Sequence, residues 1–143
     1  MIDFFVAGVP VPKGSAKAFV NRRTGRAIVM QDNRDKQKPW SSMISVTAQN
    51  LISEPVRGPV RLSVLFVMPR PKSHFGTGKN ASKLKDSAPT HHIVKPDLDK
   101  LVRCVKDALT GIAWGDDCQV CELKDVAKTY GTHPGAWISV ENL

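Results

Sequence analysis

The chain has 143 residues, of which 21 are Lys or Arg and 13 are Asp or Glu, and this length suits a single domain, predicted to span residues 1–143. Its apolar stretches are short and broken by charged residues, and its first residues lack the basic and apolar regions of a cleavable signal, so we expect neither a membrane span nor a secreted protein. A net charge of +8 and three cysteines predict a cytoplasmic protein with reduced thiols, and such a charge is typical equally of a nucleic-acid-binding surface and of a solvated one.

The first half of the sequence predicts strands, a hairpin and a helix, without repeats. Ile2–Val11 is typical of a strand, and residues 18–30 predict a hairpin with a basic tip around Arg23–Gly25. Apolar residues recur at helical spacing in Trp40–Leu51, so we expect a helix that the preceding proline helps to start. Residues 59–69 become continuously apolar, which predicts a strand buried on both faces.

Residues 69–96 are rich in Pro, Gly, Ser, Lys and His and poor in apolar residues, so they cannot form part of a core. Structureless spans of this length inside a small domain are usually functional or disordered. We therefore predict a flexible basic loop that lies as a flap over the site formed by the residues after it. Plain disorder is the open alternative.

A helix is predicted from Asp97 to the glycine at position 111, because its apolar residues form one stripe. These are Leu98, Leu101, Val105, Ala108 and Leu109. Asp97 is expected at the N-cap and Asp99 in the first turn. Two interpretations of these acids stay open: one caps the helix while the other stabilises its dipole, or both bind a metal ion.

A second acidic pair, Asp116 and Asp117, follows soon after this helix. The spacing permits the two pairs to meet but does not require it, and a polar turn before a strand over residues 118–130 is an equally good interpretation. Seven of the 13 acids lie between Asp97 and Asp125 in a chain that is otherwise basic. A basic surface around an acidic spot suits a polyanion that is bound together with a divalent cation.

These residues carry a resemblance to a known family. The run KPDLDKLVRCVKDALTGIAWGDDCQV (residues 95–120), with VPVPKGSAKAF near the N-terminus and Lys128 downstream, resembles the RusA family of Holliday-junction resolvases. The resemblance covers nearly the whole chain. Its motifs, D-L-D opening a helix and D-D-x-Q-V after it, occur in the family's order and at its spacing.

The resemblance implies a dimeric endodeoxyribonuclease that resolves four-way DNA junctions by paired symmetric nicks in recombination and repair. It also implies Mg²⁺ as cofactor, with Mn²⁺ as a substitute, and no small-molecule cofactor. By motif position, Asp97, Asp99 and Asp117 are similar to the family's essential carboxylates, and Asp116 is a weaker candidate metal ligand. A lysine that is common in the family is Arg103 here, and because a guanidinium does not readily lose its proton, we expect a phosphate contact rather than proton transfer.

The predicted fold is a single α+β domain, with a mixed β-sheet, two main helices packed against it and the long basic loop before the second helix. DNA contacts are predicted for ten basic residues: Lys13, Lys17, Arg22, Arg23, Arg26, Arg70, Lys72, Lys95, Lys100 and Lys106. Phe75 is the best exposed candidate for a wedge into a junction. The alternative function is a non-catalytic, basic junction-binding or DNA-binding module of prophage origin. Zinc bound at Cys118 and Cys121 is disfavoured, because residues three apart in a strand face opposite sides.

Overall fold

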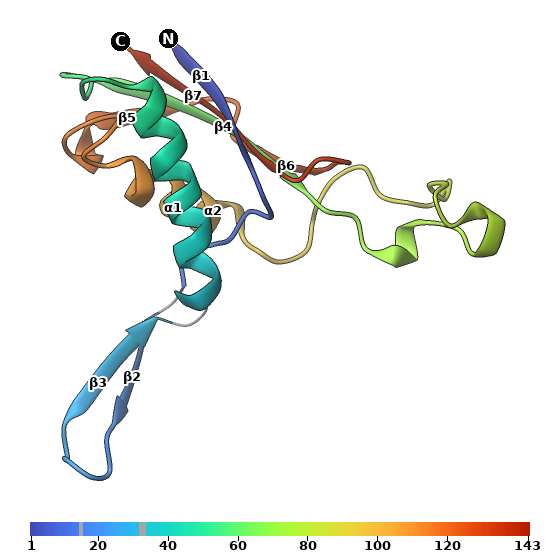
Figure 1. The fold of residues 1–143 in the computed structure, drawn as a ribbon, viewed down its shortest axis with the longest axis horizontal. Helices are drawn as coiled ribbons and strands as arrows, with labels where there is room; N and C mark the ends of the chain where they lie inside the picture. Colours follow the sequence, from blue (N-terminus) through green and yellow to red (C-terminus); the bar gives the residue numbers. More distant parts are fainter. Residues whose placement is uncertain (15, 32–33) are drawn as a thin grey trace.

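The structure, a computed structural model, describes residues 1–14, 16–31 and 34–143, and the side chains of residues 16–19, 28–31 and 34 lie outside this description. It is an α+β domain with two α-helices and a mixed five-stranded sheet, as predicted (Figure 1). The elements are β1 (Ile2–Ala7), β2 (Ala16–Val20), β3 (Ala27–Gln31), α1 (Arg34–Leu51), β4 (Val60–Met68), η1 (Lys72–His74), η2 (Gly78–Asn80), α2 (Leu98–Leu109), η3 (Asp117–Gln119), β5 (Val120–Leu123), β6 (Ala127–Tyr130) and β7 (Gly135–Asn142). Among the described residues, no helix has the length and apolar character needed to span a membrane.

The sheet is centred on β4. Strands β1, β7, β4 and β5 are neighbours in that order, and β6 pairs with β4 as well. The β1–β7 and β7–β4 pairs are antiparallel, whereas β5 and β6 both run parallel to β4. Mixed pairing brings the chain after α2 back alongside β4, so that the segment carrying the second acidic pair returns to the body of the domain.

The core lies on one face of this sheet. Alternate residues of β4 are buried, as the two-residue period of a strand requires: Val60, Leu62, Val64, Phe66 and Met68. On the other face, Leu65 is 37% exposed and Trp137 is 56% exposed. The predicted strand is present, but its predicted burial on both faces is wrong, because the residues between the buried ones are partly exposed on an open sheet face.

Helix α1 begins at Arg34, earlier than the predicted start at Trp40, and Pro39 lies inside the helix. A proline there removes one hydrogen bond, the one to the carbonyl of Asp35, and Asp35 in the first turn stabilises the positive end of the helix dipole. Residues 34–38 are all polar, so they carry no apolar stripe that predicts a helix. The buried side of α1 follows the predicted spacing: Trp40, Ile44 and Ala48.

The single strand predicted for residues 118–130 is divided into η3, β5 and β6. Strand β5 pairs with the first residues of β4, and β6 pairs with its last four. Between them Asp125 has a left-handed backbone conformation, with φ of 52°. A positive φ at a non-glycine residue interrupts an extended chain, which is why the prediction of one continuous strand is wrong.

Two segments project from the body in Figure 1. One is the predicted hairpin, in which β2 and β3 pair antiparallel around a turn at residues 21–26. The other is residues 69–96, here called the arm, which contain η1, η2 and a bridge between Phe75 and Leu84. The arm extends away from the helices, so the prediction that it lies as a flap over the start of α2 is wrong (Figure 1). Its flexibility stays a prediction.

Candidate active site

The two acids of the D-L-D motif lie at the start of α2. Asp97 has the extended backbone of an N-cap residue, and its carbonyl accepts the first helical hydrogen bond, from Leu101 N at 3.2 Å. Its carboxylate makes no capping hydrogen bond. Both Asp97 and Asp99 are exposed, and in the part of the chain that the structure describes neither side chain has a hydrogen bond or an ion pair. The capping interpretation of Asp97 therefore lacks its hydrogen bond, and both carboxylates are available to a ligand.

Lys128 of β6 holds the turn that leads into Asp97. Its ammonium donates to the carbonyl of Val94 at 2.6 Å and to that of Pro96 at 2.7 Å. The sheet thus fixes the chain on the N-terminal side of both acids. Sequence reasoning named Lys128 only as part of the family resemblance and gave it no role, because no local pattern indicates which loop a strand lysine will reach.

An exposed stripe runs along α2 from Asp99. Arg103 lies one turn further on and is exposed, and Lys106 follows on the same side with its side chain partly buried. The opposite side of the helix packs into the core through residues such as Leu101 and Val105. Since residues four apart on a helix are neighbours, the guanidinium of Arg103 lies within reach of a group bound at Asp99.

Asp117 lies at the other end of α2. Its Oδ1 accepts a hydrogen bond from Thr110 Oγ1 at 3.5 Å, and its Oδ2 lies 3.5 Å from Lys106 Nζ. At a rise of 1.5 Å per residue, Lys106 and Thr110 lie about 10 Å and 16 Å beyond Asp99 along the helix. The two acidic pairs therefore do not meet within one chain, and among the described residues no three side chains gather in a way that could hold a metal ion.

Comparison with known proteins places these motifs in a family. The model of the family described as endodeoxyribonuclease RusA matches residues 8–141. The chain belongs to the RusA family. It is also similar to the uncharacterized protein YqaN of Bacillus subtilis (strain 168), with 32% identity over 145 residues that cover 99% of this chain and 96% of the relative. The resemblance drawn from the motifs is therefore confirmed over nearly the whole chain.

In this RusA-family chain, Asp116 has a structural partner. Its Oδ1 accepts a hydrogen bond from Cys118 N at 2.9 Å at the start of η3, and this bond lowers the pKa of the carboxyl group. Gln119 closes the same turn, because its Oε1 accepts from the N–H groups of Gly115 and Asp116, both at 2.9 Å. Asp116 thus builds the turn, which leaves it the weaker candidate ligand of the pair.

RusA-family nucleases are metal-dependent, and the acids at the start of α2 fit a hard divalent cation. Asp97 and Asp99 offer carboxylate oxygens, the donors that Mg²⁺ prefers. Their exposure leaves room for the several waters that Mg²⁺ keeps and for a phosphate oxygen of the substrate. Two carboxylates with a phosphate form a sufficient set of ligands. Any third carboxylate ligand would come from outside this end of α2, because no third acid gathers with Asp97 and Asp99 among the described residues.

Some of the basic residues near these acids have their charge paired with a carboxylate of the protein. Lys13 forms an ion pair with Asp107 at 2.7 Å, and its backbone N–H donates to the carbonyl of Lys100 at 2.9 Å. The chain entering the hairpin therefore lies along the first turns of α2. Lys106 is paired with Asp117. Lys13 and Lys106 thus have their charge partly balanced inside the protein, which makes them weaker DNA contacts than their sequence positions indicate.

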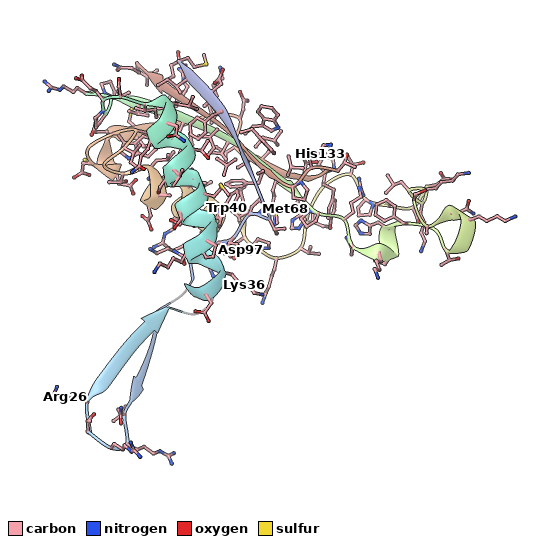
Figure 2. All side chains as sticks on the ribbon, in the orientation of Figure 1. Arg26, Lys36, Trp40, Met68, Asp97 and His133 are labelled. Carbon is pink, nitrogen blue, oxygen red and sulfur yellow. The ribbon has the colours of Figure 1, made fainter. Side chains whose placement is uncertain are left out.

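The other predicted DNA contacts lie mainly on the two projections. Arg22, Arg23 and Arg26 are exposed at the tip of the hairpin, where Figure 2 labels Arg26 far from the body. Lys72 and Arg70 belong to the arm, and in the same view Asp97 lies between the roots of the hairpin and the arm. Lys95 is exposed and Lys100 is partly buried, both beside the D-L-D acids. The side chain of Lys17 lies outside the described residues.

The three cysteines are free thiols in different surroundings. Cys104 is buried in α2, and burial raises the pKa of its thiol to about 11. Cys118 and Cys121 are exposed, and the carboxylate of Asp116 raises the pKa of Cys118. Cys118 lies in η3 rather than in the predicted strand. The disfavoured zinc site at Cys118 and Cys121 stays a prediction.

Proposed function

We propose that this protein is a Mg²⁺-dependent, structure-selective endodeoxyribonuclease that resolves four-way DNA junctions by paired nicks. The observation that carries the proposal is the pair of exposed carboxylates, Asp97 and Asp99, which have no partner among the described residues. They lie in a RusA-family chain of net charge +8. A helix start gains little from a carboxylate that makes no capping bond, whereas a divalent cation on a phosphate-binding surface uses two.

Each residue of the site has a distinct task in this proposal. When bound, Mg²⁺ would neutralise charge on the scissile phosphate and lower the pKa of an attacking water. Asp97 and Asp99 bind the ion through their oxygens, and Lys128 orients them by holding the preceding turn. Arg103 donates to a phosphate oxygen on the same open face of α2 and stabilises the charge that develops there.

A homodimer supplies the third carboxylate. Asp117 lies at the opposite end of α2 from Asp97 and Asp99. A two-fold axis perpendicular to α2 would set the helices of two subunits antiparallel, so that Asp117 of the partner subunit lies beside Asp97 and Asp99. Two identical sites would then form in each dimer, which is what two symmetric nicks across a junction require.

DNA binding is assigned to the two projections. The hairpin presents Arg22, Arg23 and Arg26 at its tip, and the arm carries six Lys or Arg residues against one acid, Asp86. Their roots converge on the start of α2, because Lys13 bonds to Lys100 and Lys128 bonds to residues 94 and 96. Phosphates held along both projections would therefore pass the D-L-D acids.

The proposal is tested by replacing Asp97, Asp99 and Asp117 with Asn, one at a time. Asp97 and Asp99 are exposed, Asp97 makes no capping hydrogen bond, and the Asp117 side chain is 45% exposed, so folding should survive and the melting temperature should stay within a few degrees of the parent. Each replacement removes a negative charge from the ion's ligands, so nicking of a labelled four-way junction in Mg²⁺ should fall by orders of magnitude. Binding of the junction without metal should persist or tighten.

Asp86→Asn, on the arm, is the matched control, because it removes the same charge from a residue outside the site, and it should cut like the parent. Linear duplex of the same sequence is the control substrate and should be cut poorly. Near-parental nicking by Asp99→Asn would contradict the proposal and return the D-L-D acids to a structural role. A parent that binds junctions but never cuts them would favour the non-catalytic binding module.

A further inference from the structure

A pocket opens at the root of the arm, beside the C-terminal end of β6. Its volume is about 510 Å³, which lies within the range of small-molecule sites. Most of its wall is apolar. We call it the root pocket. Its lining residues include Pro69, Phe75, Leu84, Tyr130, Thr132 and Pro134. It lies outside the helix stripe that carries the D-L-D acids.

The outer wall of the root pocket is a hydrogen-bonded part of the arm. Phe75 and Leu84 form an antiparallel bridge, flanked by hydrogen bonds from Gly76 N to Lys83 O at 3.0 Å and from Lys85 N to His74 O at 2.9 Å. Gly76 is required there, since a Cβ atom would lie 2.6 Å from Asn80. The arm thus builds a small hairpin that holds one aromatic ring and one leucine, itself 47% exposed, facing a cavity.

The inner wall carries a cation in a fixed position. The guanidinium of Arg70 lies 4.9 Å from the centre of the Tyr130 ring, and its Nη1 donates to Pro89 O at 2.7 Å. His74 and His92 pack against the same ring, each with ring centres 4.9 Å apart. The same Nη1 lies 3.4 Å from His74 Nδ1, and among the described residues the N–H groups of Nη2 and Nε have no partner, so these are left for a ligand at the pocket rim. An apolar slot beside a preplaced guanidinium matches a planar base joined to a phosphate.

The position of the root pocket relates it to the acids. Tyr130 and Lys128 are two residues apart in β6, so their side chains lie on the same face of the strand, about 7 Å apart. Lys128 in turn holds the carbonyls of Val94 and Pro96, directly before Asp97. A nucleotide in the root pocket would therefore belong to a strand whose neighbouring phosphates reach the D-L-D acids.

We propose that the root pocket binds one unpaired base of branched DNA, with the base against Phe75 and a phosphate on Arg70. Charge decides the class of ligand, because the arm around the pocket carries six cations and one acid, which suits a polyanion. In a duplex the bases are paired and stacked, whereas a base at a branch point or a bulge is free to enter a slot. The proposal rests on the DNA-cleaving function above and names what that function selects.

The test measures binding without metal. The probes are a duplex with a one-nucleotide bulge carrying the fluorescent base 2-aminopurine, the same bulge with an abasic sugar, and the unbulged duplex. The parent should bind the base-containing bulge about tenfold more tightly than the abasic one, as stacking on one aromatic side chain predicts. Phe75→Leu, which keeps an apolar side chain but removes the aromatic face, should lose most of that preference and bind both bulges alike.

Phe5→Leu is the control variant, since the Phe5 ring packs at a tilt against that of Trp137, with ring centres 4.7 Å apart, on the open face of the sheet and outside the root pocket. It should keep the parent's preference. Equal binding of the base-containing and abasic bulges by the parent would overturn the proposal without any variant. So would an unchanged preference in a folded Phe75→Leu protein. The binding assay contains no Mg²⁺, so its result is independent of nicking. A parent that nicks junctions but shows no preference for the base-containing bulge would reject the pocket proposal alone. A parent that shows the preference but does not nick would reject the nuclease function alone.

Discussion

At the scale of single residues, the important contrast is between Asp116 and Asp97. Both occupy N-cap positions, but only Asp116 uses its carboxylate to cap, accepting a bond from Cys118 N. The backbone before Asp97 is held instead by Lys128. The start of α2 is thus fixed by a residue from the sheet, which leaves the Asp97 carboxylate to other chemistry. This contrast could not be predicted from the sequence, because both acids stand in equally favourable capping contexts.

Replacement of Lys128 by Met should loosen the turn before Asp97, because the carbonyls of Val94 and Pro96 lose their donor. We expect nicking of a four-way junction to fall about 10- to 100-fold, as is typical when a residue that orients a metal ligand is removed. The Mg²⁺ concentration for half-maximal nicking should rise, while metal-free junction binding changes little. Lys128→Arg, which keeps a donor, should restore part of the activity.

Lys124→Met, at an exposed lysine in the same segment, is the control and should nick like the parent. An unchanged Mg²⁺ requirement in Lys128→Met would contradict the prediction.

The stability of the domain should depend on pH through His92. Its side chain is 7% exposed, its Nδ1 has no hydrogen-bond partner among the described residues, and burial, followed by the charge of Lys128, lowers its pKa. The unfolded chain therefore binds a proton near pH 6.5 that the folded chain does not yet accept, so the free energy of unfolding falls as pH drops below 6.5. Denaturant unfolding at pH 7.5 and pH 5.5 measures this difference.

His92→Phe keeps a ring against Tyr130 and should reduce that pH dependence. Arg70 and His74 contact the same Tyr130 ring and are left in place in this variant. His133→Phe, at an exposed histidine, should leave the parent's pH dependence intact. Identical pH dependence in the parent and His92→Phe would mean that His92 is not the titrating group.

At the scale of elements, α2 and the β2–β3 hairpin were predictable because each carries its own local signal. The apolar stripe of α2 and the turn residues around Gly25 need no distant partner to be recognised. Other boundaries depended on tertiary contacts. The polar start of α1 has no stripe, the break at Asp125 follows from pairing with β4, and β7, the central partner of β1 and β4, was not identified. Its alternation is interrupted by glycine, alanine and an exposed tryptophan, so it carries only a weak strand signal.

The hairpin should act mainly through charge. Replacing Arg22, Arg23 and Arg26 together with Ala removes up to three phosphate contacts, so the slope of log binding constant against log salt should become shallower by about 2 to 3. Competition binding of a junction between 50 mM and 200 mM salt measures the slope. The matched control replaces the same three residues with Lys, which keeps the charge and should keep the slope. An unchanged slope in the Ala variant would remove the hairpin tip from the DNA-binding surface.

At the scale of the whole molecule, the acids are brought to the place where two basic projections meet, and no local pattern predicts that arrangement. The family motifs indicated which acids are candidate metal ligands, and the order of predicted helices and strands indicated the fold class. The distances between the motifs could not be predicted from the sequence, because they depend on how the chain after α2 returns along β4. That return leaves Asp117 beside Lys106 and Thr110, at the far end of α2 from Asp99.

A mixing experiment decides whether Asp117 completes the site of the partner subunit. Asp99→Asn and Asp117→Asn should each be inactive alone. In a mixed dimer with antiparallel α2 helices, one site collects both replacements, while the other combines Asp97 and Asp99 of one chain with Asp117 of the partner subunit and is intact. Mixing the two inactive variants should therefore restore nicking at one strand of a four-way junction, to about half the parental rate at most. A site built within one chain would stay inactive in every mixture.

Mixing Asp97→Asn with Asp99→Asn is the control and should restore nothing, because both sites then lack a ligand from the D-L-D motif. Light scattering at micromolar concentration checks that dimers are present, and a different affinity tag on each variant allows mixed dimers to be isolated. Inactive mixed dimers of Asp99→Asn with Asp117→Asn would contradict the shared site.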